Sequence, residues 1–359
     1  MTAAKNELPL KTAPAAEIAA SNALPALLEV DRLQTFFDTR GGIFKAVDGV
    51  SFSVRPAETL AIVGESGCGK SVTALSLMRL VPDPPGRIVG GSVELAGIDL
   101  LALDEEAMRR VRGKDISMIF QEPMTSLNPV MTIGRQIAEA LLLHDSLGRS
   151  AARRKVIEML RLVRIPEPEQ RANEYPHQLS GGMRQRAMIA MALACNPKLL
   201  IAHEPTTALD VTIQAQILDI ILELQHKLGT AVILITHDLG VVAETAQRVI
   251  VMYAGRKVEE ARVDALFARP LHPYTHGLMA SIPRLAPMRG KSTRADGRLA
   301  EIPGMVPALS NLPAGCVFAP RCAFAEDRCR RQYPPYEEKR PGHWAACWRS
   351  DALCGAAHA

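Results

Sequence analysis

The feature that most constrains this chain is a glycine-rich octapeptide between a strand-like and a helix-like segment. Residues Gly64–Ser71 read Gly-Glu-Ser-Gly-Cys-Gly-Lys-Ser and fit the pattern G-x-x-x-x-G-K-[ST]. The apolar run Thr59–Val63 precedes them, and a helical pattern over Val72–Leu80 follows. Such a loop turns backbone N–H groups toward phosphate oxygens, and the helix N-terminus adds a favourable dipole. The sequence therefore predicts a nucleoside triphosphate site.

The loop also predicts individual roles. Lys70 would neutralise the β- and γ-phosphates, and the Ser71 hydroxyl would ligate Mg²⁺. A flexible glycine-rich turn is the alternative, but it explains neither the Lys-Ser pair nor the strand–loop–helix setting. The residues expected to contact ATP here are Gly64, Ser66, Gly67, Cys68, Gly69, Lys70, Ser71 and Val72.

Further apolar runs predict a parallel α/β core. Leu199–Ala202 and Ala231–Ile235 are strand-length, and each is followed by polar residues and then a helical pattern. In such sheets, ligands bind at the carboxyl ends of the strands. The segments Ala46–Val54 and Gly91–Leu100 alternate imperfectly and predict strands of a half-exposed sheet. Isoleucines 213, 217, 220 and 221 with Leu224 form one apolar stripe at helical spacing, which predicts a helix packed on the core.

A second anion-binding signal lies far along the chain. Leu179–Gln185 reads Leu-Ser-Gly-Gly-Met-Arg-Gln and opens a predicted helix. Together with the phosphate loop, it resembles the signature of ABC ATPases. In that family the signature, here Ser180, Gly181, Gly182 and Met183, completes the ATP site of the partner subunit in a head-to-tail dimer. Met183 stands where many members have glutamine and fits the peptide-importer branch.

The other landmarks of the family follow in the family's order. The resemblance implies that Gln121 contacts Mg²⁺ and the attacking water, that Glu204 is the catalytic glutamate and that His237 holds the γ-phosphate. It also implies that Ala208-Leu209-Asp210 is the loop that crosses to the other subunit. Phe37 lies at about the position of the aromatic residue that stacks on adenine, with Phe36 as the alternative.

The resemblance is most specific to ATPases of dipeptide and oligopeptide importers, with nickel importers as an alternative. It is carried by Gln121–Pro129, Tyr175–Gln178 and His272–Thr275. It implies an ABC-type α/β fold with a RecA-like parallel sheet, an antiparallel β subdomain and a helical subdomain at about 124–191. We divide the chain into a flexible tail (1–26), an ATPase domain (27–266) and a small cysteine-rich C-terminal module (267–359).

One residue departs from the family pattern. The pair before the catalytic position is His203-Glu204, where the family has Asp-Glu. Mg²⁺ prefers oxygen ligands, imidazole is a poorer choice, and a protonated histidine would repel the ion. We therefore expect ATP to bind at this site and its hydrolysis to be impaired. A regulatory subunit that binds ATP without hydrolysing it is the corresponding alternative, and a harmless substitution is the other interpretation.

Four cysteines lie close together near the C-terminus. Cys316, Cys322, Cys329 and Cys347 have the spacing C-x5-C-x6-C-x17-C. Thiols stay reduced in the cytosol, and a metal could cross-link so small a module. The residues alone leave zinc and an iron–sulfur cluster open. Some dipeptide-importer ATPases carry a [4Fe–4S] cluster at like spacing, so the resemblance favours the cluster. Cys68, Cys195 and Cys354 are expected to be incidental, and His343 is expected at the surface.

Composition bounds the partners and the location. The net charge of +4 gives no reason to expect nucleic acid as a partner. No stretch approaches the ~18 consecutive apolar residues of a membrane span, and the N-terminus does not resemble a secretory signal. The resemblance implies a peripheral subunit on the cytosolic face of the membrane. Its partners would be a second ATPase subunit, in a heterodimer, two permease subunits and, through them, a periplasmic peptide-binding protein. A soluble ABC ATPase of DNA repair or ribosome recycling is another alternative. Such proteins typically have two ATPase units in one chain, whereas this chain has one phosphate loop and one signature, which argues against it.

Overall fold

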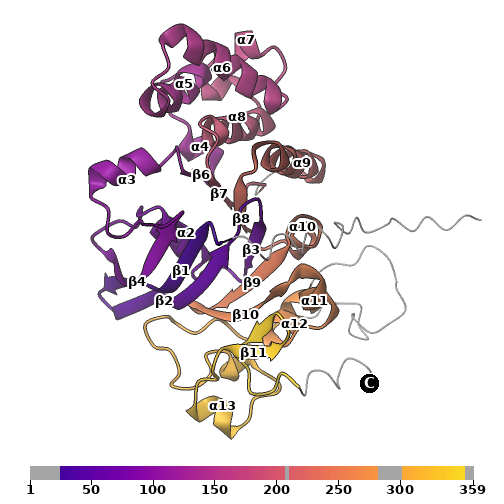
Figure 1. Cartoon of the computed structure of the whole chain (residues 1–359). Helices are drawn as coiled ribbons and strands as arrows, with labels where there is room; N and C mark the ends of the chain where they lie inside the picture. The colour runs from indigo at the N-terminus through magenta and orange to yellow at the C-terminus, as the bar shows by residue number, and fades with distance from the viewer. Residues whose placement is uncertain (1–24, 207–209, 282–300, 352–359) are drawn as a thin grey trace, which may run out of the picture.

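The fold contains two β-sheets with a group of helices on one side and, on the opposite side, the C-terminal segment, here residues 267–281 and 301–351 (Figure 1). It is seen in a computed structural model that describes residues 25–206, 210–281 and 301–351. Most of the predicted N-terminal tail, and the residues Ala208 and Leu209 of the predicted crossing loop, lie outside those ranges. None of the helices in the described ranges is long and apolar enough to cross a membrane.

The larger sheet has eight strands in the order β11-β12-β10-β9-β3-β8-β7-β6. Strands β9, β3, β8, β7 and β6 pair in parallel, whereas β10, β12 and β11 extend the sheet with antiparallel pairing. In sheet order the strands are β11 (Glu337–Arg340), β12 (His343–Ala345), β10 (Arg256–Arg262), β9 (Arg248–Tyr253), β3 (Thr59–Val63), β8 (Ala231–Ile235), β7 (Leu199–His203) and β6 (Ile116–Ile119). The predicted buried strands are thus confirmed, and the C-terminal segment is hydrogen-bonded to the edge of this sheet through β12 and β10.

The smaller sheet is antiparallel, in the order β2-β1-β4-β5. Its strands are β1 (Leu28–Thr39), β2 (Gly42–Val54), β4 (Gly86–Leu95) and β5 (Ile98–Asp99). The single strand predicted over Gly91–Leu100 is wrong, because the chain turns at Ala96 and Gly97. Both residues have positive φ, 50° and 81°, as a two-residue hairpin turn requires.

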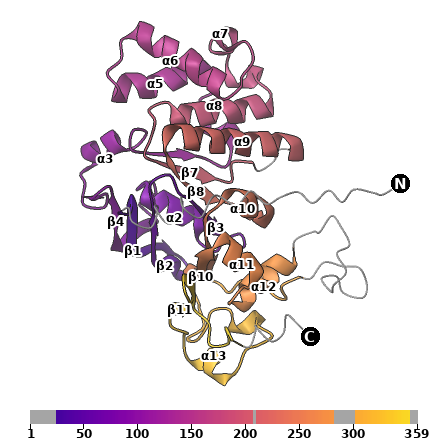
Figure 2. The same cartoon turned by 45° about the vertical axis from the view of Figure 1, so that its right-hand side comes forward.

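The helices cover the sheets in separate groups, and Figure 2 shows α8 and α9 stacked between α5–α7 and the large sheet. The helices are α2 (Lys70–Leu77), α3 (Glu105–Val111), α4 (Pro123–Ser126), α5 (Ile133–His144), α6 (Arg149–Leu162), α7 (Pro168–Arg171), α8 (Gly181–Leu193), α9 (Val211–Leu228), α10 (Leu239–Thr245), α11 (Val263–Ala268), α12 (Pro273–Ala280) and α13 (Asp327–Arg331), with 3₁₀ turns η1 (Pro176–Gln178) and η2 (Ala319–Arg321). The stripe predicted on α9 is confirmed as core, since its residues from Ile217 to Leu224 are buried.

Strand β3 shows why the parallel strands are largely apolar. Leu60 and Ile62 pack toward the small sheet and α2, whereas Ala61 and Val63 pack toward α10 and the C-terminal segment. Both faces are therefore covered, and the residues after Thr59 do not alternate with polar ones. This burial places the carboxyl end of β3, where the glycine-rich loop begins, at the rim of a rigid core.

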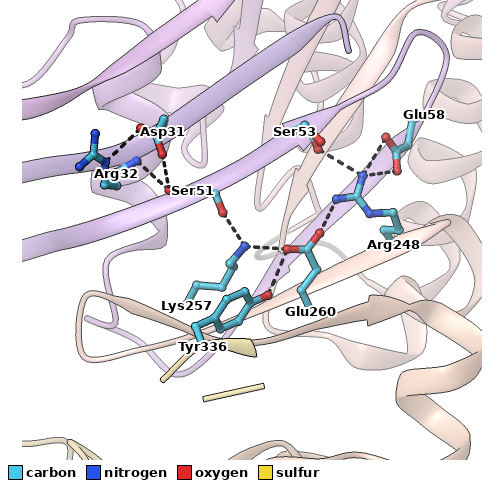
Figure 3. Close-up of polar contacts among 9 residues, drawn as sticks. All are labelled: Asp31, Arg32, Ser51, Ser53, Glu58, Arg248, Lys257, Glu260 and Tyr336. Atoms are coloured by element: carbon cyan, nitrogen blue, oxygen red, sulfur yellow. Dashed lines mark hydrogen bonds and ion pairs between the residues drawn. The ribbon is translucent and has the colours of Figure 1, made fainter. Parts of the chain in front are cut away.

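A largely buried polar network, here called the seam, joins β2 of the small sheet to the antiparallel pair β9–β10 of the large sheet, since Arg248 also donates to the carbonyl oxygen of Ser53 at 3.2 Å (Figure 3). Arg248 donates to Glu58 at 2.9 Å and to Glu260. Lys257 donates to Glu260 at 2.7 Å, and the Tyr336 hydroxyl donates to the same carboxylate at 3.2 Å. Two cations and two carboxylates are thus paired away from solvent, as buried charges must be.

Candidate nucleotide site

The phosphate loop requires glycine at its first and sixth positions, Gly64 and Gly69. Gly64 has φ +152° and Gly69 has φ +105°, values that L side chains rarely adopt. A Cβ on Gly64 would lie 2.3 Å from the carbonyl oxygen of Met252, and a Cβ on Gly69 would lie 2.3 Å from that of Ala46. Close backbone approach, as well as the turn itself, therefore excludes side chains at both positions.

Lys70 lies inside the loop that it is predicted to serve. Its ammonium donates to the carbonyl oxygens of Gly64 at 2.7 Å and Glu65 at 3.0 Å. The Cys68 thiol is 3.8 Å from the same nitrogen, and burial raises its pKa, so it stays protonated. Helix α2 begins at Lys70, which places the free N–H groups of its first turn beside this cation. Loop, lysine and helix N-terminus together form a concentrated positive site suited to phosphate.

Ser71 and His203 meet at the predicted metal position. The Ser71 hydroxyl and Nε2 of His203 are 2.8 Å apart. His203 ends β7 with 8% of its surface exposed, and burial lowers the pKa of its imidazole. The ring is therefore neutral near pH 7, and repulsion of Mg²⁺ by a protonated histidine does not operate. What remains is the weaker preference of Mg²⁺ for a nitrogen ligand than for a carboxylate.

Three further predicted residues come together at the carboxyl ends of β6, β7 and β8. The amide nitrogen of Gln121 donates a hydrogen bond to Glu204 at 2.8 Å. The amide oxygen of Gln121 is then the atom that could coordinate a metal ion. His237 Nδ1 lies 3.3 Å from the other carboxylate oxygen of Glu204. The side chain of Glu204 is 14% exposed and that of His237 is 66% exposed. The parallel sheet thus gathers a carboxylate, an amide and an imidazole whose sequence positions are far apart.

The backbone of Glu204 is held in an unusual conformation. Its φ is +45°, in the left-handed region that non-glycine residues rarely occupy. Its N–H donates to the carbonyl oxygen of Ile235 at 2.8 Å, which fixes the residue beside β8. Such conformations cluster at functional sites, where surrounding structure holds them in place.

Both candidate adenine-stacking residues lie at the end of β1. Phe37 packs on the backbone of Gly86, where an added Cβ would be 2.5 Å from its ring. The Lys45 ammonium lies 5.4 Å from the ring centre of Phe36. Both phenylalanines are half-buried, so the choice between them stays a prediction.

The signature residues form the N-terminus of a separate helix. Ser180 is the N-cap of α8, and its hydroxyl accepts from the Met183 N–H at 3.3 Å. Gly182 packs on Ile213 of α9, where a Cβ would come within 3.2 Å. Asp210, the described end of the predicted crossing loop, caps α9 by accepting from the Ile213 N–H at 2.9 Å. In Figure 1, α8 belongs to the helical group and α2 to the sheets, so the two anion-binding helix ends lie on different parts of the fold.

The four C-terminal cysteines line one small cavity of about 20 Å³. Burial raises the pKa of Cys316 to about 11 and that of Cys347 to about 12, and also raises that of Cys322. A metal or cluster would therefore have to displace protons on binding. Among the described residues, no three His, Cys, Asp or Glu side chains are arranged to hold a single metal ion. The four cysteines thus share one cavity, but as they are arranged they do not form a site for one metal ion.

The expectation that His343 lies at the surface is wrong. Its side chain is buried, and Nε2 lies 2.7 Å from a carboxylate oxygen of Glu259. The same carboxylate accepts from the N–H groups of Leu271 and His272, so it anchors the start of α12. No local pattern around His343 indicates a partner 84 positions away.

Sequence reasoning also missed residues that hold the phosphate loop. Glu65 of the loop is hydrogen-bonded to Tyr274 and Arg321. Tyr274 belongs to His272–Thr275, one of the segments that carry the resemblance to peptide-importer ATPases. The sequence alone gives no chemical role to this segment. Its position in α12 now supplies one.

Comparison with known proteins agrees with this geometry. The family model described as ABC transporter matches residues 47–207. A second model, described as the oligopeptide/dipeptide transporter C-terminal region, matches residues 258–329.

Similar proteins extend the match over nearly the whole chain. A probable peptide ABC transporter ATP-binding protein of Sinorhizobium fredii is 60% identical, covering 91% of this chain and 96% of the relative. An oligopeptide transport ATP-binding protein of Bacillus subtilis is 52% identical, covering 90% and 88%. A dipeptide transport ATP-binding protein of the same organism is 51% identical, covering 90% and 95%.

Among solved structures, a dimeric ATP-binding cassette in a post-hydrolysis state with ADP and Pi is similar in fold. It is 27% identical with a TM-score of 0.59, covering 66% of this chain and 98% of the solved one.

Proposed function

The chain belongs to the ABC transporter family, in the group with an oligopeptide/dipeptide transporter C-terminal region, and we propose that it hydrolyses ATP to drive import of dipeptides or oligopeptides through a membrane permease. The observation that carries the ATPase activity is that Ser71 of the phosphate loop contacts His203, the neighbour of Glu204, while Glu204 contacts Gln121 and His237. The peptide cargo is supported by the C-terminal match and by the names of the relatives.

In this proposal the residues divide the reaction between them. The loop and Lys70 bind the phosphates, and Ser71 and Gln121 offer oxygen ligands to Mg²⁺, which neutralises charge on the phosphates when bound. Glu204 accepts a hydrogen bond from the attacking water and orients it. His237 lies against Glu204 and contacts the γ-phosphate.

His203 weakens one of these contributions. Its neutral imidazole occupies the place beside Ser71 where the family has a carboxylate. ATP binding depends mainly on the loop, whereas the chemical step depends on charge stabilisation around the metal. We infer that this chain's own site binds ATP and hydrolyses it slowly, which keeps a regulatory, poorly hydrolysing subunit as the second candidate.

The signature implies a partner. The site formed with Ser180, Gly181 and Gly182 would take its phosphate loop and metal ligands from a second ATPase subunit, and the dimeric cassette of similar fold is consistent with this arrangement. We propose a heterodimer with a different ATPase subunit, bound to two permease subunits at the cytosolic face of the membrane.

We further propose that the cysteine cavity holds a [4Fe–4S] cluster. In such a cluster each thiolate binds a different iron, so the four sulfurs need not surround one point. A zinc ion would need all four sulfur atoms at about 2.3 Å from the ion itself. Protein purified anaerobically should be brown and contain roughly four irons per chain. Stoichiometric zinc without iron would replace this proposal with a structural zinc site.

The transport function is tested in the assembled complex. Proteoliposomes that contain the permease subunits, the partner ATPase and this chain should transport labelled dipeptides or oligopeptides when ATP is supplied on the side of the membrane that carries the ATPase subunits. The Lys70→Ala variant should abolish nucleotide binding at this chain's loop and reduce import. Uptake of Ni²⁺ but not of peptides would assign the complex to nickel import. Peptide uptake without any turnover at this chain's own site would assign it a regulatory role.

A further inference from the structure

The phosphate loop is held by the C-terminal segment at one residue, Glu65. The Glu65 carboxylate accepts two hydrogen bonds from Arg321, at 2.6 Å from Nη1 and 3.0 Å from Nη2. The Glu65 backbone N–H donates to the Tyr274 hydroxyl at 2.7 Å. Arg321 ends the turn η2, and Tyr274 lies in the first turn of α12. Side chain and backbone of one loop residue are therefore fixed from outside the ATPase motifs.

Arg321 is itself rigidly placed. Its side chain is 4% exposed, and it also donates to the carbonyl oxygens of Pro303 at 2.9 Å and Ile302 at 3.2 Å. Its guanidinium lies 5.8 Å from the ring centre of Tyr253 and 6.0 Å from that of Phe318. The hydrogen bond to Glu65 raises the already high pKa of this guanidinium, so it is charged at every working pH. A buried, bidentate arginine of this kind fixes geometry as well as charge.

Tyr274 is held equally firmly. It is fully buried, and its ring packs on Tyr253 and Phe318 with ring centres 4.6 Å and 5.5 Å apart. Its hydroxyl can therefore not follow the loop if the loop moves. Two rigid groups on separate C-terminal elements thus define where Glu65 lies.

The loop needs such support. Three of its eight residues are glycines with positive φ, so the isolated segment has many accessible conformations. A loop that orders only on binding loses part of its binding free energy to that ordering, and preorganisation removes the loss.

We propose that Arg321 and Tyr274 are positioning residues that hold the phosphate loop, through Glu65, in its nucleotide-binding conformation. The C-terminal segment then contributes to ATP affinity without touching the nucleotide. This inference rests on the proposed nucleotide site, and it adds a role for the segment that is separate from any group bound by the cysteines.

A titration of the full chain with ADP in the absence of Mg²⁺ tests it without reference to hydrolysis or to His203. Arg321→Met and Glu65→Gln should each weaken ADP binding about tenfold, and the double variant should be no weaker than the single ones, because both remove the same interaction. Tyr274→Phe, which removes only the hydroxyl, should weaken binding about threefold. At this chain's own site in the assembled complex, Arg321→Met and Tyr274→Phe should raise the ATP concentration for half-maximal single-turnover hydrolysis by similar factors, while the rate at saturating ATP changes by less than twofold.

Arg330→Met is the matched control. Arg330 belongs to the same segment, but its ion pair with Asp327 is exposed, so ADP affinity should be unchanged. If Arg321→Met fails to fold, Glu65→Gln and Tyr274→Phe carry the test. Wild-type affinity in both of these, or a loss in Arg321→Met that Glu65→Gln does not share, would overturn the proposal. Absence of ADP binding in the wild-type chain would overturn the nucleotide site itself, which is a distinguishable result.

Discussion

The two ends of the large sheet use charge in opposite ways. At the parallel end, Lys70, His203, Glu204 and His237 lie at the carboxyl ends of strands, and part of this group is open to solvent. Beside the antiparallel pair β9–β10, the four charged groups of the seam have side chains that are at most 15% exposed, and they are paired with one another (Figure 3).

This difference separates groups that serve a ligand from groups that serve the fold. The polar side chains of the parallel end contact one another and the loop backbone, as in the 2.8 Å contact of Gln121 with Glu204 and the 3.3 Å contact of His237 with Glu204. A phosphate and a metal can replace such contacts at small cost. The seam has no such role, because its charges are desolvated and already satisfied. Substitutions at the parallel end should therefore change binding and turnover, and those in the seam should change stability.

The largest effect is expected for Lys70→Ala. The ammonium would make charge-assisted hydrogen bonds to two phosphates, and losing both costs about 4 kcal/mol, or roughly a thousandfold in affinity for ATP. Equilibrium titration measures this loss, and the thermal midpoint without nucleotide should stay near that of the wild type. Lys198→Ala, which removes an exposed ion pair with Asp115, is the control and should bind normally. Unchanged affinity in Lys70→Ala would refute the site assignment.

Glu260→Gln should destabilise the fold by about 3 kcal/mol at pH 7, because it leaves Lys257 buried without its carboxylate partner. Urea denaturation measures this, and nucleotide affinity below the transition should be retained. Glu106→Gln, which breaks an exposed i,i+4 pair with Arg110, should change stability by less than about 0.5 kcal/mol. Equal effects of the two variants would show that the seam is no more than a surface ion pair.

His203→Asp should raise the hydrolysis rate at this chain's site about a hundredfold, since restoring an oxygen ligand near the metal is worth roughly 2.7 kcal/mol in the transition state. Single-turnover hydrolysis by the complex at saturating Mg²⁺ measures the step, and the site that uses Ser180 should change little. His226→Asp places the same substitution on the exposed end of α9 and should have no effect. A rate unaltered by His203→Asp would make His203 a tolerated substitution.

The smallest effect is a pH dependence of the seam. Burial alone would raise the pKa of Glu260, but Lys257 and Arg248 outweigh it, so the net pKa lies below its ordinary value of 4.5. The unfolded chain then binds this proton more readily, and the stabilisation is present above pH 4.5 and is lost as the pH falls through the lowered pKa. The gap in thermal midpoint between wild type and Glu260→Gln should therefore narrow from pH 7 toward pH 3. A constant gap would show that Glu260 does not titrate with folding.

Much of the parallel end follows from sequence because its signals are local. The run Thr59–Val63, the glycines after it and Lys70-Ser71 specify strand, turn and helix start within thirteen residues. The rule that ligands bind at the carboxyl ends of parallel strands then brings Gln121, Glu204 and His237 to the same edge. Boundaries were less predictable, since α2 starts at Lys70 and ends at Leu77, ahead of Arg79, whose φ is +51°.

The sequence by itself determined the phosphate loop, the buried strands and the family, because each depends on spacing over a few residues. Only the tertiary structure decided that His203 is buried and neutral, that His343 pairs with Glu259 and that Glu65 is held by Tyr274 and Arg321. The Glu65 partners lie 209 and 256 positions away in the chain. No periodicity or motif indicates such a pairing, because it depends on how α12 and the rest of the C-terminal segment pack against the edge of the sheet.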